Sequence, residues 1–436
     1  MEPTGLITPQ PWMTAPETAA VMAAFHEAGA EARFIGGCVR DAVLGRQARD
    51  IDIATPVEPE QVLKILETAN IRAIPTGIQH GTVTAVIGTQ HFEITTLRID
   101  VESYGRHAKV AFTDDWTQDA ARRDFTINTM SCDEHGNIYD PYEGLEDLSK
   151  GCIRFVGDAK QRIKEDVLRL LRFFRFYAQY GKRPINGKAV LACRTLAHRL
   201  SELSGERVRG ELFRILTGPN PADTVTLMRA ERVLDYILPE AGEVGRLRML
   251  AWLLERAVKW EDVDIHPVRR LAALLKPDLT QDELSALAER LKFSNRERDH
   301  LLAMCIAEPN SSHPAVILPI IRAEMSDKDL RIACRQLGKE VVMDRALLQW
   351  AGELALEARL PPSRTQLWRT LIETAHNCDI APFPLKGRDL LDLGIAHGPE
   401  VGRLLKDIEA WWMGEDFRPD RAACLDKLTQ LLKPTA

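Results

Sequence analysis

The sequence predicts an α+β head, with a small mixed or antiparallel sheet flanked by helices, followed by an all-α C-terminal half. Over roughly the first 150 residues helical patterns alternate with strand patterns of period two, and from about Ala159 the apolar spacing is helical throughout. A chain of 436 residues also exceeds what one hydrophobic core usually supports. We therefore expect four parts, namely a head (1–148), a neck (149–217), a helical body (218–306) and a helical tail (307–436).

The elements of the head follow from residue period and boundary signals. The first helix ends near Gly29, because glycine favours helix C-termini. The stretch Asp50-Ile51-Asp52-Ile53 alternates polar and apolar side chains, which is the pattern of a half-buried strand. In order, we expect a helix (14–29), a strand (33–35), a helix (38–44), a strand (50–53), a helix (58–70) and a β-hairpin (81–87 with 91–97).

The composition is that of an ordinary globular protein, with 45% hydrophobic and 28% charged residues. Apolar runs such as 271–275 are far shorter than the roughly 20 residues that a membrane-spanning helix needs, so no membrane partner is expected. The eight cysteines are scattered and form no Cys-x-x-Cys pair, which argues against zinc binding and a disulfide framework. We therefore expect a cytoplasmic protein.

Charge is unevenly distributed along the chain. The net charge is −6, yet residues 151–215 hold 15 Lys/Arg against 6 Asp/Glu. A localised basic segment on an acidic protein favours one surface that faces a polyanion. On charge alone, a solvated helical face explains the pattern equally well.

Asp50 and Asp52 are the main candidates for chemistry. Because they are two residues apart on a strand, their side chains project from the same face. Neighbouring carboxylates repel each other, so the arrangement is costly without a cation between them. Mg²⁺ binds a few carboxylate oxygens together with water and substrate phosphates. The pair therefore indicates a magnesium site, although taken alone it fits a polar strand edge better.

The residues upstream favour the magnesium site. Gly36-Gly37-Cys38-Val39-Arg40-Asp41 lies at a predicted strand-to-helix transition. Glycines let the backbone approach a phosphate closely, and the following helix N-terminus offers unpaired N–H groups. Strand, glycine turn, helix and dicarboxylate strand, in that order, suit metal-assisted attack on the α-phosphate of a nucleotide.

Together these residues resemble the first motif of the class II tRNA nucleotidyltransferase and bacterial poly(A) polymerase family, within the polymerase β superfamily. Five further stretches are similar to the family's later motifs and follow in the same order, and the resemblance covers about residues 30–240. These stretches are 93–98, 122–128, 140–148, 165–172 and 206–216. The resemblance implies a nucleotidyltransferase head and template-independent addition of CCA to tRNA from CTP and ATP.

The resemblance also implies roles for particular residues. Asp50 and Asp52 would be the catalytic ligands of Mg²⁺, and Glu93 could complete the metal site. The residues implied to bind the nucleotide are Gly36, Gly37, Arg40, Arg123, Asp124, Asn128, Asp166, Arg169 and Arg172. The candidates for RNA contact in the basic segment are Lys160, Arg162, Arg175 and Lys182.

Asp166 and Arg169 are three residues apart, so a helix would place them on one face. A carboxylate only accepts hydrogen bonds and a guanidinium only donates them. Cytosine and adenine present an amino donor beside a ring-nitrogen acceptor, whereas uracil and guanine present the reverse. The pair is therefore complementary to C and A, and unpaired polar groups can give discrimination of about 10⁴-fold or more. Alone, the same residues would fit intrahelical salt bridges worth about 0.3–0.5 kcal/mol each.

The member of the family is indicated by the segment at 100–112. It is polar and contains glycine, so we expect a mobile loop. It resembles the flexible loop of members that add the full CCA. The alternatives are a poly(A) polymerase, an enzyme that adds only CC or only A, or a catalytically silent RNA-binding protein.

Overall fold

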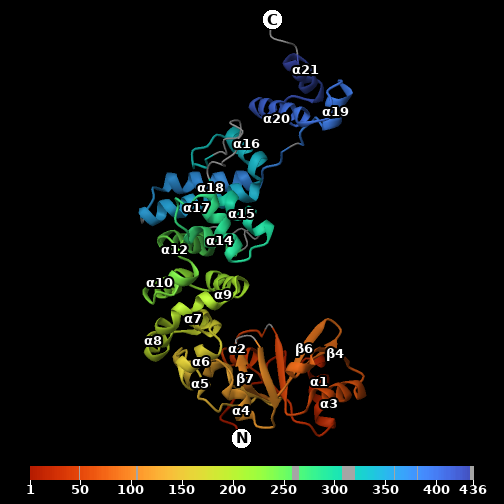
Figure 1. Cartoon of the computed structure of the whole chain (residues 1–436), viewed down its shortest axis with the longest axis vertical. Coiled ribbons are helices and arrows are strands. Elements are labelled where there is room, and N and C mark those ends of the chain that lie inside the picture. The colour runs from red at the N-terminus through yellow and green to blue at the C-terminus, as the bar shows by residue number, and fades with distance from the viewer. Residues whose placement is uncertain are drawn as a thin grey trace. The chain divides into compact units, whose positions relative to one another are not determined.

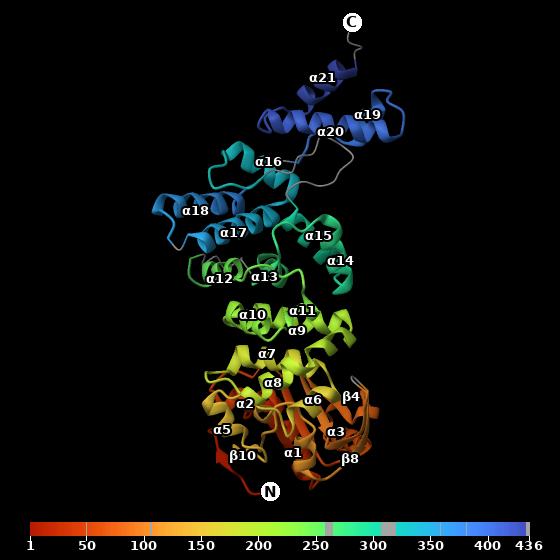
Figure 2. The same ribbon diagram turned by 60° about the vertical axis from the view of Figure 1, so that its left-hand side comes forward.

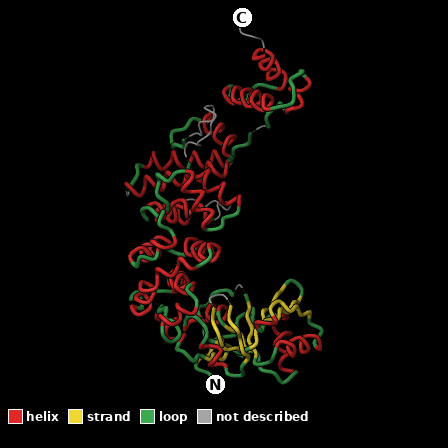
Figure 3. Tube along the Cα trace, viewed as in Figure 1, coloured by secondary structure: helices red, strands yellow, loops and turns green. Residues whose placement is uncertain are grey.

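The computed structural model describes residues 1–48, 50–104, 107–257, 265–306, 320–357, 359–380 and 382–432. The chain forms two compact units, Met1–Pro239 and Glu240–Ala436. The strands that Figure 3 draws all belong to the first unit, and the labelled elements of the second unit in Figure 1 are helices. The predicted fold class is confirmed. The boundaries at 148, 217 and 306 stay a prediction.

The head is built on one eight-stranded mixed sheet. Near its centre β3 (Ile51–Thr55) and β6 (Gln90–Thr96) run parallel, and the other neighbouring strands are antiparallel. The remaining strands, in sheet order, are β1 (Gly5–Leu6), β10 (Asn137–Tyr139), β9 (Ser131–Cys132) and β2 (Arg33–Ile35) beside β3, and β5 (Thr82–Ile87) and β4 (Arg72–Gly77) beside β6. The predicted hairpin is confirmed as β5 and β6.

The predicted helices of the head are confirmed as α1 (Pro16–Glu27), α2 (Gly37–Val43) and α3 (Pro59–Thr68). Proline stands in the first turn of α1 and α3, where its missing N–H would have no intrahelical partner. The short helix α4 (Trp116–Ala121) precedes the second motif.

The segment at 100–112 differs from the expectation. Instead of a loop, β7 (Arg98–Tyr104) and β8 (His107–Phe112) pair as a separate antiparallel sheet. Polar and apolar residues alternate along 98–104 with the period of a strand. The loop was predicted instead from the polar composition and from the glycine in the middle of the segment. Gly105 and Arg106 lie outside the described residues.

Helices complete the first unit, and an aromatic core fixes them to the head. Phe125 of the head packs against Phe155, with ring centroids 4.8 Å apart, and against Phe176, at 5.2 Å. Figures 1 and 2 show α7 between the head and α9. The helices are α5 (Gly144–Lys150), α6 (Ala159–Glu165), α7 (Leu168–Tyr180), α8 (Gly187–Leu196), α9 (Gly205–Thr217), α10 (Pro221–Ala230) and α11 (Leu234–Ile237).

The second unit is helical in its described part. Its largest buried side chains include Trp350, Trp368 and Trp412. The helices are α12 (Gly245–Trp252), α13 (Pro267–Leu274), α14 (Gln281–Arg290), α15 (Asn295–Cys305), α16 (Asp327–Leu337), α17 (Lys339–Leu356), α18 (Pro362–His376), α19 (Gly387–Asp392), α20 (Pro399–Gly414) and α21 (Arg421–Leu432). Within the described ranges, none of the helices is both long and apolar enough to cross a membrane.

Candidate active site

A polar cavity of about 650 Å³ opens in the first unit, between the sheet of the head and helices α7 and α9. Arginine side chains outnumber the acidic ones around it. Its lining residues are Gly36, Gly37, Arg40, Asp52, Arg98, Arg122, Arg123, Asp124, Asn128, Asp166, Leu168, Arg169, Arg172, Phe176 and Arg207. An excess of guanidinium groups suits a polyanionic ligand such as a triphosphate.

Of the carboxylates that were predicted to bind metal, Asp52 lines this cavity, and Asp50 and Glu93 are its neighbours. Asp52 on β3 stands opposite Glu93 on β6 in the parallel register, and Asp50 immediately precedes β3. Burial raises the pKa of Asp52 to about 6, with further contributions from the charges of Glu93 and Asp50, while Arg123 opposes the rise. The three carboxylates therefore repel one another.

The donor set suits a hard divalent cation that also binds substrate. In the described part of the chain, no three or more His, Cys, Asp or Glu side chains form a complete metal-binding group. Mg²⁺ needs only one or two protein carboxylates when phosphate oxygens and water supply the remaining ligands. The like-charge repulsion at Asp52 indicates the same need for a cation.

The glycine turn brings the backbone close to an arginine. Gly36 precedes α2 with φ of +68°, a backbone conformation that favours glycine. A Cβ atom at this position would lie 3.4 Å from Nη1 of Arg123. Glycine therefore keeps the space in front of Arg123 open to a ligand.

Three arginines gather around one buried carboxylate in this region. Arg122 Nε and Arg123 Nη2 donate to Asp119, at 2.8 and 3.0 Å, and the backbone N–H of Arg98 donates to the same side chain at 3.2 Å. Burial lowers the pKa of the Arg98 guanidinium, and the charge of Arg122 lowers it further. One carboxylate does not neutralise three guanidinium groups, so the cluster can bind an anion.

A chain of hydrogen bonds connects the first, second and fourth motifs. Arg40 Nη1 donates to Asn128 Oδ1 at 2.6 Å, Asn128 Nδ2 donates to Asp124 Oδ1 at 3.0 Å, and Arg172 Nε donates to Asp124 Oδ2 at 2.6 Å. Burial opposes ionisation of Asp124, but the charge of Arg172 and these hydrogen bonds hold its pKa below the usual value. The four side chains form one rigid wall of the cavity.

The predicted base-selecting residues line the same cavity, but the predicted helix geometry is wrong. Asp166 has an extended backbone and lies in the break between α6 and α7, and Arg169 lies in the first turn of α7. Asp166 Oδ1 accepts from the N–H of Leu168 at 3.1 Å. Helix continuation was predicted from spacing alone, whereas the short carboxylate side chain accepts from the backbone N–H two residues further on, a local hydrogen bond that competes with a continuous helix.

Asp166 and Arg169 are held by different partners. Arg207 Nη2 donates to both carboxylate oxygens of Asp166, whereas Arg169 Nη1 donates to Glu165 at 2.6 Å. Arg169 Nη2 also donates to the carbonyl of Arg122 at 3.0 Å. Each side chain is thus fixed independently while both face the cavity.

The four candidates for RNA contact divide into two pairs. Arg162 forms an ion pair with Glu165 at 2.5 Å, and Arg175 Nε lies 2.8 Å from Glu211 at an angle that does not satisfy a hydrogen bond. These guanidinium groups are mostly buried and stabilise the neck. Lys160 and Lys182 are exposed, as a phosphate contact requires.

Five lining residues were absent from the site that the sequence predicted, namely Arg98, Arg122, Leu168, Phe176 and Arg207. Arg98 ends the strand motif, Arg122 precedes Arg123, and Arg207 opens the fifth motif, so their place in the motifs was the available signal. Phe176 carried no such signal, because an aromatic residue at helical spacing is typical of a core.

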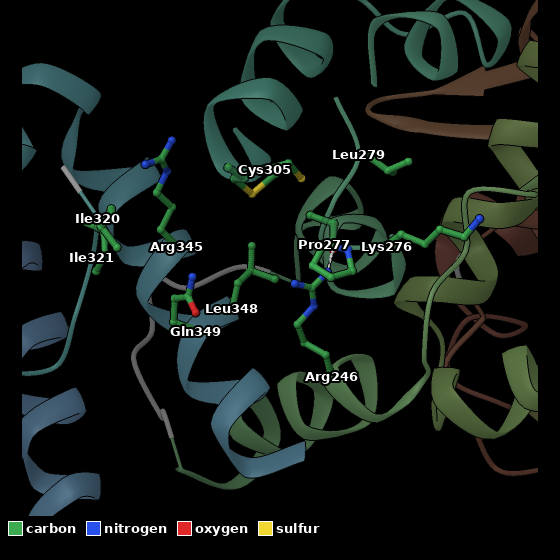
Figure 4. Close-up of a pocket in the computed structure, with 12 residues that line it drawn as sticks. Arg246, Lys276, Pro277, Leu279, Cys305, Ile320, Ile321, Arg345, Leu348 and Gln349 are labelled. Carbon is green, nitrogen blue, oxygen red and sulfur yellow. Dashed lines mark hydrogen bonds between the residues drawn. The ribbon is translucent and has the colours of Figure 1, made fainter. Parts of the chain in front are cut away.

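A second cavity of about 190 Å³ lies in the second unit (Figure 4). Its arginines donate hydrogen bonds to backbone carbonyls near the C-terminal ends of neighbouring helices. Arg246 Nη2 donates to the carbonyl of Ala272 at 2.7 Å, and Arg345 Nε donates to that of Ala303 at 2.7 Å. Burial lowers the pKa of both guanidinium groups. This cavity is smaller than the one in the first unit, which the predicted site residues line.

The chain is similar to known proteins over most of its length. Residues 32–154 match the family described as the poly A polymerase head domain, and residues 185–243 match the probable RNA and SrmB-binding site of polymerase A. The chain is 34% identical to the mitochondrial CCA tRNA nucleotidyltransferase 1 of Mus musculus, covering 94% of this chain and 88% of that protein. It is 30% identical to the CCA-adding enzyme of Lactococcus lactis subsp. cremoris (strain MG1363), covering 95% and 96%. The structure of the Bacillus stearothermophilus CCA-adding enzyme in complex with CTP aligns with a TM-score of 0.64 at 26% identity, covering 92% and 93%.

Proposed function

Because this chain belongs to the family of CCA tRNA nucleotidyltransferases, or CCA-adding enzymes, we propose that it adds C, C and A in turn to the 3′ end of tRNA. CTP and ATP are the substrates, pyrophosphate is released, and no nucleic-acid template is used. The cavity that joins Asp52, the arginine cluster and the Asp166–Arg169 pair is the observation that carries this proposal.

The arginine cluster binds the triphosphate in this proposal. Arg122 and Arg123 share the carboxylate of Asp119, which also accepts from the backbone N–H of Arg98, and phosphate oxygens complete the hydrogen bonding of the three guanidinium groups. The open space in front of Gly36 brings the phosphates close to the backbone. Asp124 and Asn128, held by Arg172 and Arg40, orient the sugar.

Asp50 and Asp52 hold Mg²⁺ in this proposal, with Glu93 beside Asp52. The raised pKa of Asp52 supports the assignment, because a bound cation relieves the repulsion among the three carboxylates. Bound Mg²⁺ supplies activation of the RNA 3′-hydroxyl and charge neutralisation for pyrophosphate. The 3′-hydroxyl loses its proton to water, and its oxygen forms a bond to the α-phosphorus as the bond to the pyrophosphate oxygen breaks.

Selection of the base rests on Asp166 and Arg169. Arg207 fixes the carboxylate of Asp166, whose remaining lone pairs can accept from the amino group of cytosine or adenine. The guanidinium of Arg169 donates to the adjacent ring nitrogen. Uracil and guanine would place acceptor against acceptor and donor against donor, which leaves polar groups unpaired.

The proposal is tested by offering the purified protein tRNA that lacks one, two or three terminal nucleotides, with single NTPs and with mixtures. We expect two C additions from CTP alone, one A addition only after CC, and no further extension. Long A tracts from ATP alone would identify a poly(A) polymerase instead, and a product that stops at CC would identify a partial enzyme.

A catalytically silent RNA-binding protein would give no incorporation in the same assay. The double variant Asp50→Ala, Asp52→Ala provides the control. It should bind tRNA but incorporate nothing, whereas incorporation at the wild-type rate would show that these carboxylates are not the catalytic ligands.

Two finer assignments complete the proposal. Lys160 and Lys182 contact tRNA phosphates, since both are exposed on the basic neck. The protein works in the cytoplasm, whose reducing conditions suit the eight free cysteines.

A further inference from the structure

Two cysteines of the second unit meet where the chain leaves α18 for the C-terminal helices. Cys334 lies on α16 and Cys378 follows the end of α18, and each helix packs against the other. Lys339 Nζ donates to the carbonyl of His376 at 3.5 Å. The fold therefore brings the segments that carry the two cysteines side by side.

The two thiols differ in their access to solvent. Cys334 is 6% exposed, whereas Cys378 is half-buried. Burial, together with the neighbouring Cys378, raises the pKa of the Cys334 thiol to about 12, and Lys339 opposes this rise. A soluble oxidant therefore meets Cys378 first, and Cys334 is placed to react with the product.

Helix α16 is also the helix that holds the last three helices, residues 387–432. Arg331 Nε donates to Asp416 at 3.1 Å, and Arg335 Nη2 donates to Glu409 at 2.6 Å. Ile332 packs on the apolar cluster around Trp412. A bond between α16 and residue 378 would thus fix the start of the segment that connects α18 to these helices.

We propose that Cys334 and Cys378 form an oxidisable dithiol, which peroxide converts to an intramolecular disulfide between α16 and the segment that follows α18. This inference goes beyond the nucleotidyl transfer proposed above. It accords with cytosolic disulfides, which are usually transient and redox-sensing.

The chemistry needs one peroxide molecule for each disulfide. The Sγ atom of Cys378 attacks hydrogen peroxide, the O–O bond breaks, and Cys378 becomes a sulfenic acid with release of water. The Sγ atom of Cys334 then forms the S–S bond as the S–O bond of Cys378 breaks, and its proton leaves with the hydroxyl group as a second water. Two electrons pass to peroxide in total, and a thiol such as dithiothreitol returns them.

The test uses the full-length protein with hydrogen peroxide as the oxidant. After treatment, the protein is denatured, alkylated with iodoacetamide, digested and analysed by mass spectrometry. We expect two fewer alkylated cysteines per chain, a linked peptide pair containing Cys334 and Cys378 that is lighter by about 2 Da than the reduced pair, and full reversal by dithiothreitol.

Variants make the result specific. In Cys378→Ser, all remaining thiols should still be alkylated after mild oxidation. Cys152→Ser removes another half-buried thiol, in the first unit, and should still form the linked peptide. Cys378→Ala gives a second test if the serine variant folds poorly. Recovery of Cys378 as sulfinic acid, or linked to another cysteine, with Cys334 still alkylated in the wild-type protein would overturn the proposal.

Discussion

Arg207 Nη2 donates to both carboxylate oxygens of Asp166, at 2.9 and 2.8 Å, and so connects the start of α9 to the break between α6 and α7. Both side chains are about one-fifth exposed and line the cavity. The orientation of the Asp166 carboxylate is therefore set by a distant helix, 41 residues further along the chain. Base selection in the cavity should therefore depend on Arg207 as well as on Asp166.

Replacing Asp166 with alanine should loosen the exclusion of UTP and GTP. The carboxylate is the only acceptor in the proposed base-selecting pair, and a hydrogen bond to a charged group is worth about 1.5–3 kcal/mol, so the ratio of C or A to U or G incorporation should fall about 10- to 100-fold. The measurement is kcat/KM for each NTP with trimmed tRNA. Asp158→Asn, at the N-cap of α6, is the control, since asparagine preserves that cap. Unchanged selectivity in Asp166→Ala would remove this residue from base recognition.

Replacing Arg207 with alanine should also weaken selectivity, but less than the loss of Asp166 itself. Asp166 would keep its hydrogen bond from Leu168 N–H and lose the two contacts that fix its rotation. We expect a change in selectivity with kcat for CTP reduced less than tenfold, as measured by the same assay. Arg214→Ala, which removes an exposed guanidinium of the same helix from its ion pair with the buried Glu211, should leave selectivity unchanged. An effect of equal size in both variants would indicate damage to α9 rather than loss of positioning.

The sequence predicted the head well because its elements have strong local signals. The strand at 33–35 was placed at the observed residues, and the bounds of the first three helices were within two residues of those observed. Period, proline at helix starts and glycine turns act over a few residues, so a single sequence contains them.

The sequence did not reveal the contacts between residues that are far apart along the chain. The Asp166–Arg169 pair was placed on one helix because spacing does not reveal that the backbone becomes extended at Asp166. The Arg207 contact, and the burial of Arg162 and Arg175 in ion pairs with Glu165 and Glu211, depend on segments that come together only in the fold. A count of basic residues cannot distinguish such ion pairs from phosphate contacts.

Gly144→Ala should destabilise the first unit. An added Cβ would lie 2.3 Å from the carbonyl oxygen of Thr126, a backbone atom that cannot move aside cheaply. We expect a loss of about 1–3 kcal/mol or more in the free energy of unfolding, measured by urea denaturation. Gly187→Ala is the matched control, because its Cβ would meet nothing within 4 Å. It should be neutral or stabilising by about 0.4–1 kcal/mol. Equal stability of the two variants would show that the contact at Thr126 does not constrain position 144.

Arg123→Ala should weaken the binding of CTP much more than that of CMP. Arg123 faces the open space at Gly36 and shares Asp119 with Arg122, so the triphosphate is its proposed partner. Loss of one charge-assisted contact of about 1.5–3 kcal/mol corresponds to a 10- to 100-fold rise in the Kd for CTP, measured by calorimetry. Arg72→Ala, on the exposed edge strand β4, should change neither Kd. A parallel loss of CTP and CMP affinity would place Arg123 at the base or sugar instead.

Asp52→Asn should abolish transfer and yet stabilise the protein at pH 8. The pKa of Asp52 is about 6 in the folded protein, above the roughly 3.9 of an unfolded aspartate, so the folded state binds this proton more tightly. Its contribution to stability is therefore fully present below the unfolded pKa and is lost as the pH rises through 6. At pH 8 the ionised group costs on the order of 1–2 kcal/mol, after allowance for its partial exposure, and asparagine removes that cost.

The measurement is thermal unfolding of both proteins between pH 4 and pH 8, with and without Mg²⁺. The variant should unfold at the higher temperature at pH 8, and the difference should shrink as the pH falls through 6, where the wild-type carboxyl becomes neutral. Mg²⁺ should raise the Tm of the wild type at pH 8 and have less effect at pH 5, because the protonated carboxyl is a poor ligand. Glu67→Gln, an exposed carboxylate of α3, should behave like the wild type throughout. Two results together would contradict this prediction: equal Tm values for wild type and Asp52→Asn at pH 8, and equal responses to Mg²⁺. They would mean that the charge of Asp52 neither destabilises the folded protein nor binds the ion.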